Sequence, residues 1–99
     1  MPNEITSENF NKDVLECTGK LLVLFWVEWA LPSVEMLMRL ENLEGIPTAS
    51  VDIEKYPDVA KAVDIRAAPT LVLFENGEYR GFKVGLISAI QAYTWANAL

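Results

Sequence analysis

The chain alternates apolar runs typical of strands with segments whose apolar residues recur every three or four positions, as in helices. The clearest strand signal is residues 21–27, which are apolar throughout and so typical of a central strand covered on both faces. The expected strands are residues 4–6, 21–27, 48–53, 70–75 and 79–84. The expected helices run from Thr6 or Ser7 to Cys17, from Ser33 to about Glu44, over 58–63 and from Ser88 onward. This order predicts a mixed α/β sheet with helices on both faces.

Turn and cap residues sharpen these boundaries. The pair Asn76-Gly77 predicts a tight hairpin, because a two-residue turn needs positive φ at both central positions. Ser33 and Ser88 are expected to cap helices, since a serine hydroxyl accepts hydrogen bonds from free N–H groups at a helix start. The expected buried faces are Phe10 and Val14 in the first helix, Val34, Leu37, Met38 and Leu40 in the second, and Ala92, Trp95, Ala96 and Leu99 in the last.

Length and composition limit the class of protein. Ninety-nine residues are enough for one core, so a single domain over 1–99 is expected. A hydrophobic content of 52% with 22% charged residues indicates a globular chain rather than a disordered one. The chain opens without a basic segment before an apolar stretch, and its longest apolar run is too short to cross a bilayer, so a cytoplasmic location is expected. The net charge of −6 disfavours nucleic-acid or anionic-membrane partners.

Two residue types that carry much enzyme chemistry are scarce. There is no histidine, which removes the commonest general base and metal ligand. Cys17 is the single cysteine, so no intrachain disulfide, zinc cluster or iron–sulfur site can form from thiolates. Neither a metal nor a cofactor is therefore expected. Cys17 itself is expected to be an inert or modestly exposed thiol of ordinary reactivity near the end of the first helix, with a regulatory or intermolecular disulfide as the alternative.

The segment Trp29-Ala30-Leu31-Pro32-Ser33, directly after the long apolar run, resembles the active-site turn of the thioredoxin family, Trp-Cys-Gly-Pro-Cys. Other local matches extend the resemblance over essentially the whole chain. They are Phe25-Trp26-x-Glu28-Trp29, Val51-Asp52-Ile53, Ala68-Pro69-Thr70, Phe74-x-Asn76-Gly77 and Val84-Gly85. The resemblance implies the thioredoxin fold, with a central mixed sheet flanked by helices on both faces.

The resemblance implies thiol–disulfide exchange as the family reaction, which needs an attacking thiolate and a second thiol that resolves the mixed disulfide. Position 30 corresponds to the nucleophile and position 33 to the resolving cysteine, but they hold Ala30 and Ser33. The chain as written is therefore expected to be redox-inactive. Many thioredoxins also place a buried aspartate and a lysine where this chain has Leu24 and Ser50.

The resemblance further implies a cis bond before Pro69, with the backbone of Ala68 free to pair with a partner strand by β-augmentation. The partner groove would be lined by Trp29, Leu31, Pro32, Ala68, Pro69, Val84 and Gly85. A plainer interpretation is that these residues only close the fold. Pro32 and Ser33 suit the first turn of any helix.

Two functions remain open from the sequence. In the first, the chain is a disabled form of a disulfide reductase, and the parent protein with both cysteines takes electrons from a donor resembling thioredoxin reductase. In the second, the chain is a natural binding module that holds a protein or peptide in the groove. Loss of the acid and its lysine partner together with both thiols favours natural loss. Alanine and serine, however, are also what an experimenter substitutes for cysteine. A monomer is expected in either case.

Overall fold

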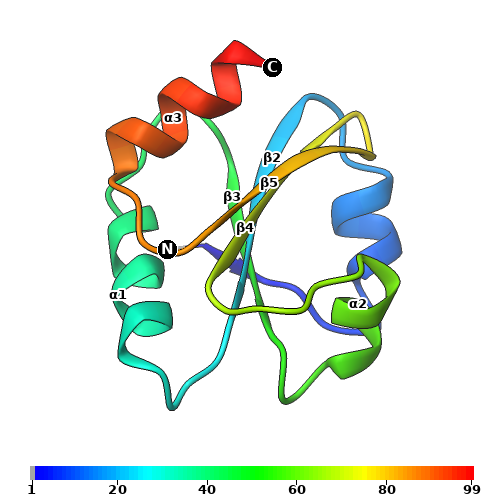
Figure 1. Ribbon diagram of the computed structural model, residues 1–99. Helices are drawn as coiled ribbons and strands as arrows, with labels where there is room; N and C mark the ends of the chain where they lie inside the picture. The colour runs from blue at the N-terminus through cyan, green and yellow to red at the C-terminus, as the bar shows by residue number, and fades with distance from the viewer. Residues whose placement is uncertain (1) are drawn as a thin grey trace.

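The computed structural model describes residues 2–99 and shows a five-stranded sheet in the order β1-β3-β2-β4-β5 (Figure 1). Strands β1, β3 and β2 are parallel, whereas β4 is antiparallel to both β2 and β5. The strands are β1 (Asn3–Glu4), β2 (Lys20–Trp26), β3 (Thr48–Asp52), β4 (Thr70–Glu75) and β5 (Glu78–Val84). The helices are η1 (Asn11–Leu15), which is a π-helix, α1 (Leu31–Leu40), α2 (Pro57–Ala62) and α3 (Ala89–Ala98). The expected α/β fold with helices on both faces is confirmed.

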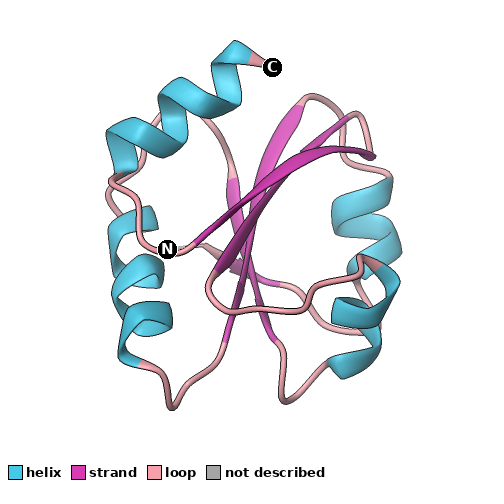
Figure 2. Cartoon of the chain, viewed as in Figure 1, coloured by secondary structure: helices cyan, strands magenta, loops and turns pink. Residues whose placement is uncertain are grey.

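Helices α1 and α3 cover one face of the sheet, while η1 and α2 cover the other (Figures 1 and 2). Strand β2 contributes to both cores, because successive side chains of a strand point to opposite faces. Leu22 and Leu24 pack in the α1/α3 core, and Val23 and Phe25 pack in the η1/α2 core. Burial on both sides explains why residues 21–27 show no alternation of apolar and polar positions.

The β4–β5 hairpin turns at Asn76 and Gly77, whose φ angles are 53° and 79°, as the sequence predicts. The pairing is irregular one step further along, since Leu73 faces Gly81 while Phe74 faces Tyr79. Arg80 is therefore an extra residue in β5, a β-bulge.

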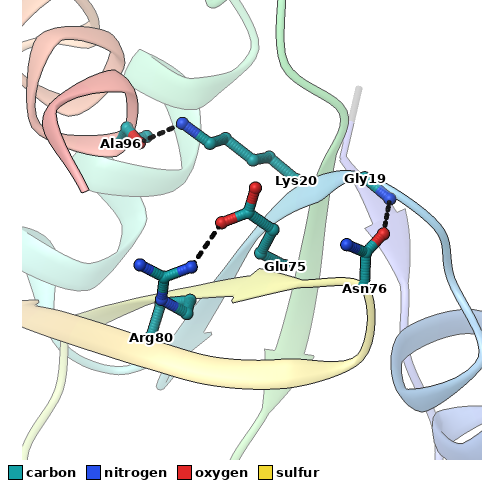
Figure 3. A network of polar contacts seen from close by, with 6 residues as sticks. All are labelled: Gly19, Lys20, Glu75, Asn76, Arg80 and Ala96. Carbon is teal, nitrogen blue, oxygen red and sulfur yellow. Dashed lines mark hydrogen bonds and ion pairs between the residues drawn. The ribbon is translucent and has the colours of Figure 1, made fainter.

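Three polar contacts secure the end of the sheet at which β2 begins and β4 ends (Figure 3). They are the Gly19 N–H to Asn76 Oδ1 bond of 2.7 Å, the Lys20 Nζ to Ala96 carbonyl bond of 2.8 Å, and the Arg80 to Glu75 ion pair of 2.6 Å. We call this end, containing Gly19, Lys20, Glu75 and Asn76, the hairpin end. The opposite end, containing residues 29–33 and 67–69, is the turn end.

The N-terminal segment differs from its expected form. The first strand is Asn3–Glu4 rather than residues 4–6, and the first helix is shortened to the five residues of η1. The Thr6 hydroxyl accepts hydrogen bonds from the Glu8 and Asn9 N–H groups. These local side-chain bonds hold a turn where a regular helix was expected. Val14 is buried as predicted, whereas Phe10 is half-buried.

The second helix also differs. It ends at Leu40 instead of Glu44, and a tighter turn with i→i+3 hydrogen bonds follows it. Its buried residues are Ser33, Met36 and Leu40, spaced three and four apart as one helix face requires. Met38 lies about 200° around the helix from Met36 by the 3.6-residue period, and its side chain is 60% exposed. The expected core role of Met38 was wrong, and Val34 and Leu37 are half-buried.

Helix α3 begins as predicted. The Ser88 hydroxyl accepts from the Gln91 N–H, and the Gln91 side chain accepts from the Ser88 N–H, which is a capping box. Its buried residues are Ala92 and Ala96, and Trp95 is half-buried. Leu99 lies beyond the last helical turn and is exposed, contrary to the prediction. Within residues 2–99, no helix has the length and apolar character needed to cross a membrane.

Candidate active site

The turn after β2 presents two large apolar side chains to solvent. Trp29 is 74% exposed and Leu31 is 82% exposed, and Pro32 is also exposed. Ala30 is the N-cap of α1 in extended conformation, and its carbonyl accepts from the Ser33 N–H at 3.0 Å. Position 30 thus lies half-buried at the N-terminus of a ten-residue helix, and position 33 lies in its first turn.

Ser33 is not the helix cap that the sequence predicts. Because α1 begins at Leu31, the serine lies inside the helix and its side chain is fully buried. Its hydroxyl is the one buried side-chain oxygen or nitrogen within residues 2–99 that has no hydrogen-bond partner. A buried hydroxyl without a partner costs about 1–3 kcal/mol. The surroundings of position 33 therefore fit a group that needs no hydrogen bond better than they fit a serine.

Leu24 and Ser50 are direct neighbours across the β2–β3 pair. Both are buried, and Leu24 packs in the α1/α3 core with Met36 and Leu40. Neither an alkyl side chain nor a serine hydroxyl ionises near neutral pH. This pair of positions therefore supplies no acid or base to a group at position 33.

The loop before β4 contains a cis peptide bond between Ala68 and Pro69. Two contacts hold the loop: the Thr70 hydroxyl donates to the Ala67 carbonyl at 2.7 Å, and the Gly85 N–H donates to the Pro69 carbonyl at 2.9 Å. Within residues 2–99, the N–H and C=O of Ala68 have no hydrogen-bond partner. The backbone of Ala68 is therefore available to pair with an added strand.

The sheet register brings the predicted groove residues to one end of the molecule. Phe25 pairs with Thr70, and Thr70 pairs with Val84, so the segments that follow β2, precede β4 and follow β5 all lie at the turn end. Val84 is exposed and Gly85 and Ala68 are half-buried, but Pro69 is buried. Pro69 thus shapes the loop and presents little surface of its own.

A hollow elsewhere on the molecule was not predicted from the sequence. It is a groove of about 760 Å³ beside β5, on the η1/α2 face of the sheet. It reaches from Ala67 and Val84 at the turn end to Leu15 and Gly77 at the hairpin end. The available signal was the pair of aromatic residues Tyr79 and Phe82 on the last strand, which standard alternation would have placed on opposite faces.

Cys17 is far from this chemistry. It is a free, half-buried thiol that packs against the η1/α2 core and precedes β2 at the hairpin end. It cannot supply the sulfur that positions 30 and 33 lack. In the part of the chain that the structure describes, no three His, Cys, Asp or Glu side chains are grouped to hold a metal ion.

Comparison with known proteins identifies the family. The family model described as Thioredoxin matches residues 1–94. The thioredoxin of Rickettsia felis is 34% identical over 103 aligned residues, covering 98% of this chain and 97% of that protein. The thioredoxin of Buchnera aphidicola subsp. Schizaphis graminum is 39% identical over 93 residues, covering 89% and 86%. The chain therefore belongs to the thioredoxin family, whose reaction is thiol–disulfide exchange.

Proposed function

We propose that this chain is a redox-inactive thioredoxin, in which the site of a disulfide reductase holds alanine and serine in place of its two cysteines. Reduction requires a thiolate to attack the substrate disulfide and a second thiol to release the product. Ala30 has no nucleophilic atom, and the Ser33 hydroxyl cannot form the disulfide that completes the exchange. The chain keeps the surface around the site but lacks both sulfur atoms.

The buried Ser33 hydroxyl is the observation that carries the reductase origin of the site. A thiol is a weak hydrogen-bond donor and tolerates apolar surroundings, whereas a serine hydroxyl does not. The absence of an acceptor around Ser33 Oγ is what a pocket formed around cysteine would leave behind. The site therefore fits the cysteine-containing form of the family better than its own serine.

An insulin-reduction assay with a dithiol donor tests the inactivity. The chain should give the same rate of turbidity as a control without protein. Cys17→Ser serves as the matched variant, because it removes the remaining thiol and leaves the turn unchanged. A rate clearly above the control that survives Cys17→Ser would refute the assignment of position 30 as the obligatory nucleophile.

Restoring both cysteines tests the origin of the site. The variant Ala30→Cys/Ser33→Cys should reduce insulin, because a thiol at position 30 would lie at the N-terminus of α1, where the helix dipole and free N–H groups lower the pKa of a thiol. The single variant Ala30→Cys is the control and should form mixed disulfides without turnover. A double variant that forms the 30–33 disulfide but turns over no substrate would contradict the proposal.

A second candidate function is a natural binding module that holds a protein partner in the groove. It is favoured by the unpaired backbone of Ala68 and by the exposed side chains of Trp29, Leu31 and Val84, which are available whether or not a thiol is present. Leu24 and Ser50 also agree with a lineage released from proton transfer. The natural gene sequence at codons 30 and 33 separates the two candidates, since cysteine codons there identify a substituted reductase.

A further inference from the structure

The groove beside β5 is an apolar hollow whose lining does not include positions 30 and 33. Its walls include three side chains of the η1/α2 face of β5, namely Tyr79, Phe82 and Val84, each about half exposed. They lie on one face because Tyr79 pairs with Phe74 and Phe82 pairs with Val72, both of which belong to the η1/α2 core. A hollow of about 760 Å³ is in the size range of ligand sites.

We propose that this groove holds an extended peptide segment with bulky, uncharged side chains, and that the segment continues from the partner strand paired with Ala68. The proposal rests on the second candidate function above, in which the turn end binds a protein or peptide partner, and it names the sequence class of that partner segment. Continuity supports the assignment: Ala67 and Val84 border the groove and adjoin Ala68 and Gly85 in the chain.

The shape of β5 indicates an extended occupant. Phe82 and Val84 are two residues apart and share a face, which matches the side-chain spacing of a strand lying alongside them. β5 is also the last strand in the sheet order, so within residues 2–99 its outer edge has no partner strand. An added segment would find backbone donors and acceptors on that edge and apolar pockets beside it, as in β-augmentation.

The charges around the groove indicate an uncharged occupant. Its two charged lining residues, Asp64 and Arg66, pair with each other at 3.2 Å between Oδ1 and Nε. The groove thus presents no unbalanced charge that a lysine or glutamate of the partner would neutralise. A second copy of this chain is a poor occupant, because each copy carries a net charge of −6 and the two would repel.

Two short blocked peptides test the proposal, one with phenylalanine and leucine at alternate central positions and one with alanine there. NMR titration of the full chain should show the alanine peptide shifting the amides of Ala67 and Ala68. The phenylalanine–leucine peptide should shift those amides and also the amides of Tyr79, Phe82 and Val84. Shifts confined to the turn end with both peptides would overturn this inference while leaving the peptide-binding function intact.

Binding affinities sharpen the test with a matched pair of surface variants. Phe82→Thr removes one wall of the groove. Ile90→Thr removes an apolar side chain of α3, on the other face of the sheet, that is more exposed than Phe82 (78% against 55%). Phe82→Thr should weaken binding of the phenylalanine–leucine peptide about tenfold and leave the alanine peptide unchanged. Ile90→Thr should change neither. Equal weakening by both variants would overturn the proposal.

The remaining outcomes are also informative. Failure of both peptides to shift any amide overturns the peptide-binding function and this inference together. Shifts of Phe82 and Val84 that grow with protein concentration in the absence of peptide would show that a second copy fills the groove. Sedimentation of the same samples would then reveal a dimer, which contradicts the proposed occupant.

Discussion

The two ends of the sheet differ in whether their polar groups have hydrogen-bond or ionic partners. At the hairpin end, the side chains of Lys20, Asn76 and Arg80 each have a partner, and these contacts join β2, the hairpin and α3 (Figure 3). At the turn end, the Ser33 hydroxyl and the Ala68 backbone have no partner within residues 2–99, and Trp29 is exposed. The hairpin end is built for stability. The free Ala68 backbone and the exposed Trp29 are what a surface that meets another molecule offers, whereas the buried Ser33 hydroxyl is a polar group in a place that does not suit it.

The largest loss of stability is expected from a carboxylate within β2, in the core beneath the turn end. Leu24→Asp should destabilise the fold by about 4 kcal/mol at neutral pH, because the charge would be buried in the α1/α3 core without a partner. Burial raises the pKa of the new carboxyl in the folded state, so the loss should shrink as pH falls through that raised value. Urea unfolding across the acid range measures this. A pH-independent loss would show that cavity formation, not charge, is responsible.

Leu24→Asp can also be added to the Ala30→Cys/Ser33→Cys variant. There it should change the rate of product release from the mixed disulfide more than the rate of attack on the substrate disulfide. A carboxyl in this position could take the proton of the resolving thiol. Rapid-mixing experiments separate the two steps. Restored activity equal to that of an ordinary thioredoxin without the aspartate would show that Leu24 is no mark of lost function.

At the hairpin end, adding a single methyl group should lower the stability of the fold. A Cβ at Gly77 would overlap the Leu15 carbonyl oxygen, and φ is +79° there, so Gly77→Ala should cost about 3 kcal/mol. Gly19→Ala is the matched control, because φ is +77° but nothing lies within 4 Å of the added methyl, and it should cost about 1 kcal/mol. Chemical denaturation compares them. Equal losses would show that backbone conformation alone matters and that the close approach does not.

Ser33→Cys should stabilise the protein by about 1 kcal/mol, because it removes a buried hydroxyl that has no partner. Ser88→Ala provides the contrast, since it removes a hydroxyl that caps α3 and should destabilise by about 1 kcal/mol. Thermal unfolding under reducing conditions measures both. A loss of stability in Ser33→Cys would mean that the serine is satisfied in solution, and the proposed reductase origin would lose its main support.

The smallest effect concerns Tyr79 on β5. Partial burial, and secondarily the nearby Asp64 carboxylate, raise the pKa of Tyr79 above its usual value of 10.0. The folded state therefore favours the neutral phenol, and its stability should decline as pH rises above 10 through the raised pKa. Absorbance titration of tyrosinate, assigned with Tyr79→Phe, measures the shift. Asp64→Asn should bring the pKa down, and an unchanged value would exclude the carboxylate as a contributor.

The sequence predicted the sheet and the hairpin well because their signals are local. The unbroken apolar run at residues 21–27 by itself indicates a strand buried on both faces. Asn76-Gly77 by itself indicates a tight two-residue turn. The α1 register was harder to predict. Serine is favoured as a cap by propensity, but the helix begins two residues earlier and the serine becomes buried. Tertiary packing decided that outcome.

The residues of the candidate site could be named from the sequence, but their exposure and the shape of the surface they form could not. The motif residues around Trp29 and Pro69 indicated which loops meet, and the register of Phe25 with Thr70 explains why they do. The groove beside β5 depends on an irregularity in strand pairing. Tyr79 and Phe82 were a signal for it, but regular alternation would have placed them on opposite faces. The burial of Pro69 likewise follows from how the loop folds back.

The extra residue in β5 bears on self-assembly. A flat, fully regular edge strand is a template on which further chains can stack without limit. Here the bulge at Arg80 leaves only residues 81–84 of the outer edge in regular alternation, beside the turn end. That stretch is long enough to hold a short partner segment but too short to template a sheet. The same irregularity that places two aromatic rings on one face thus also limits open-ended aggregation along the exposed edge.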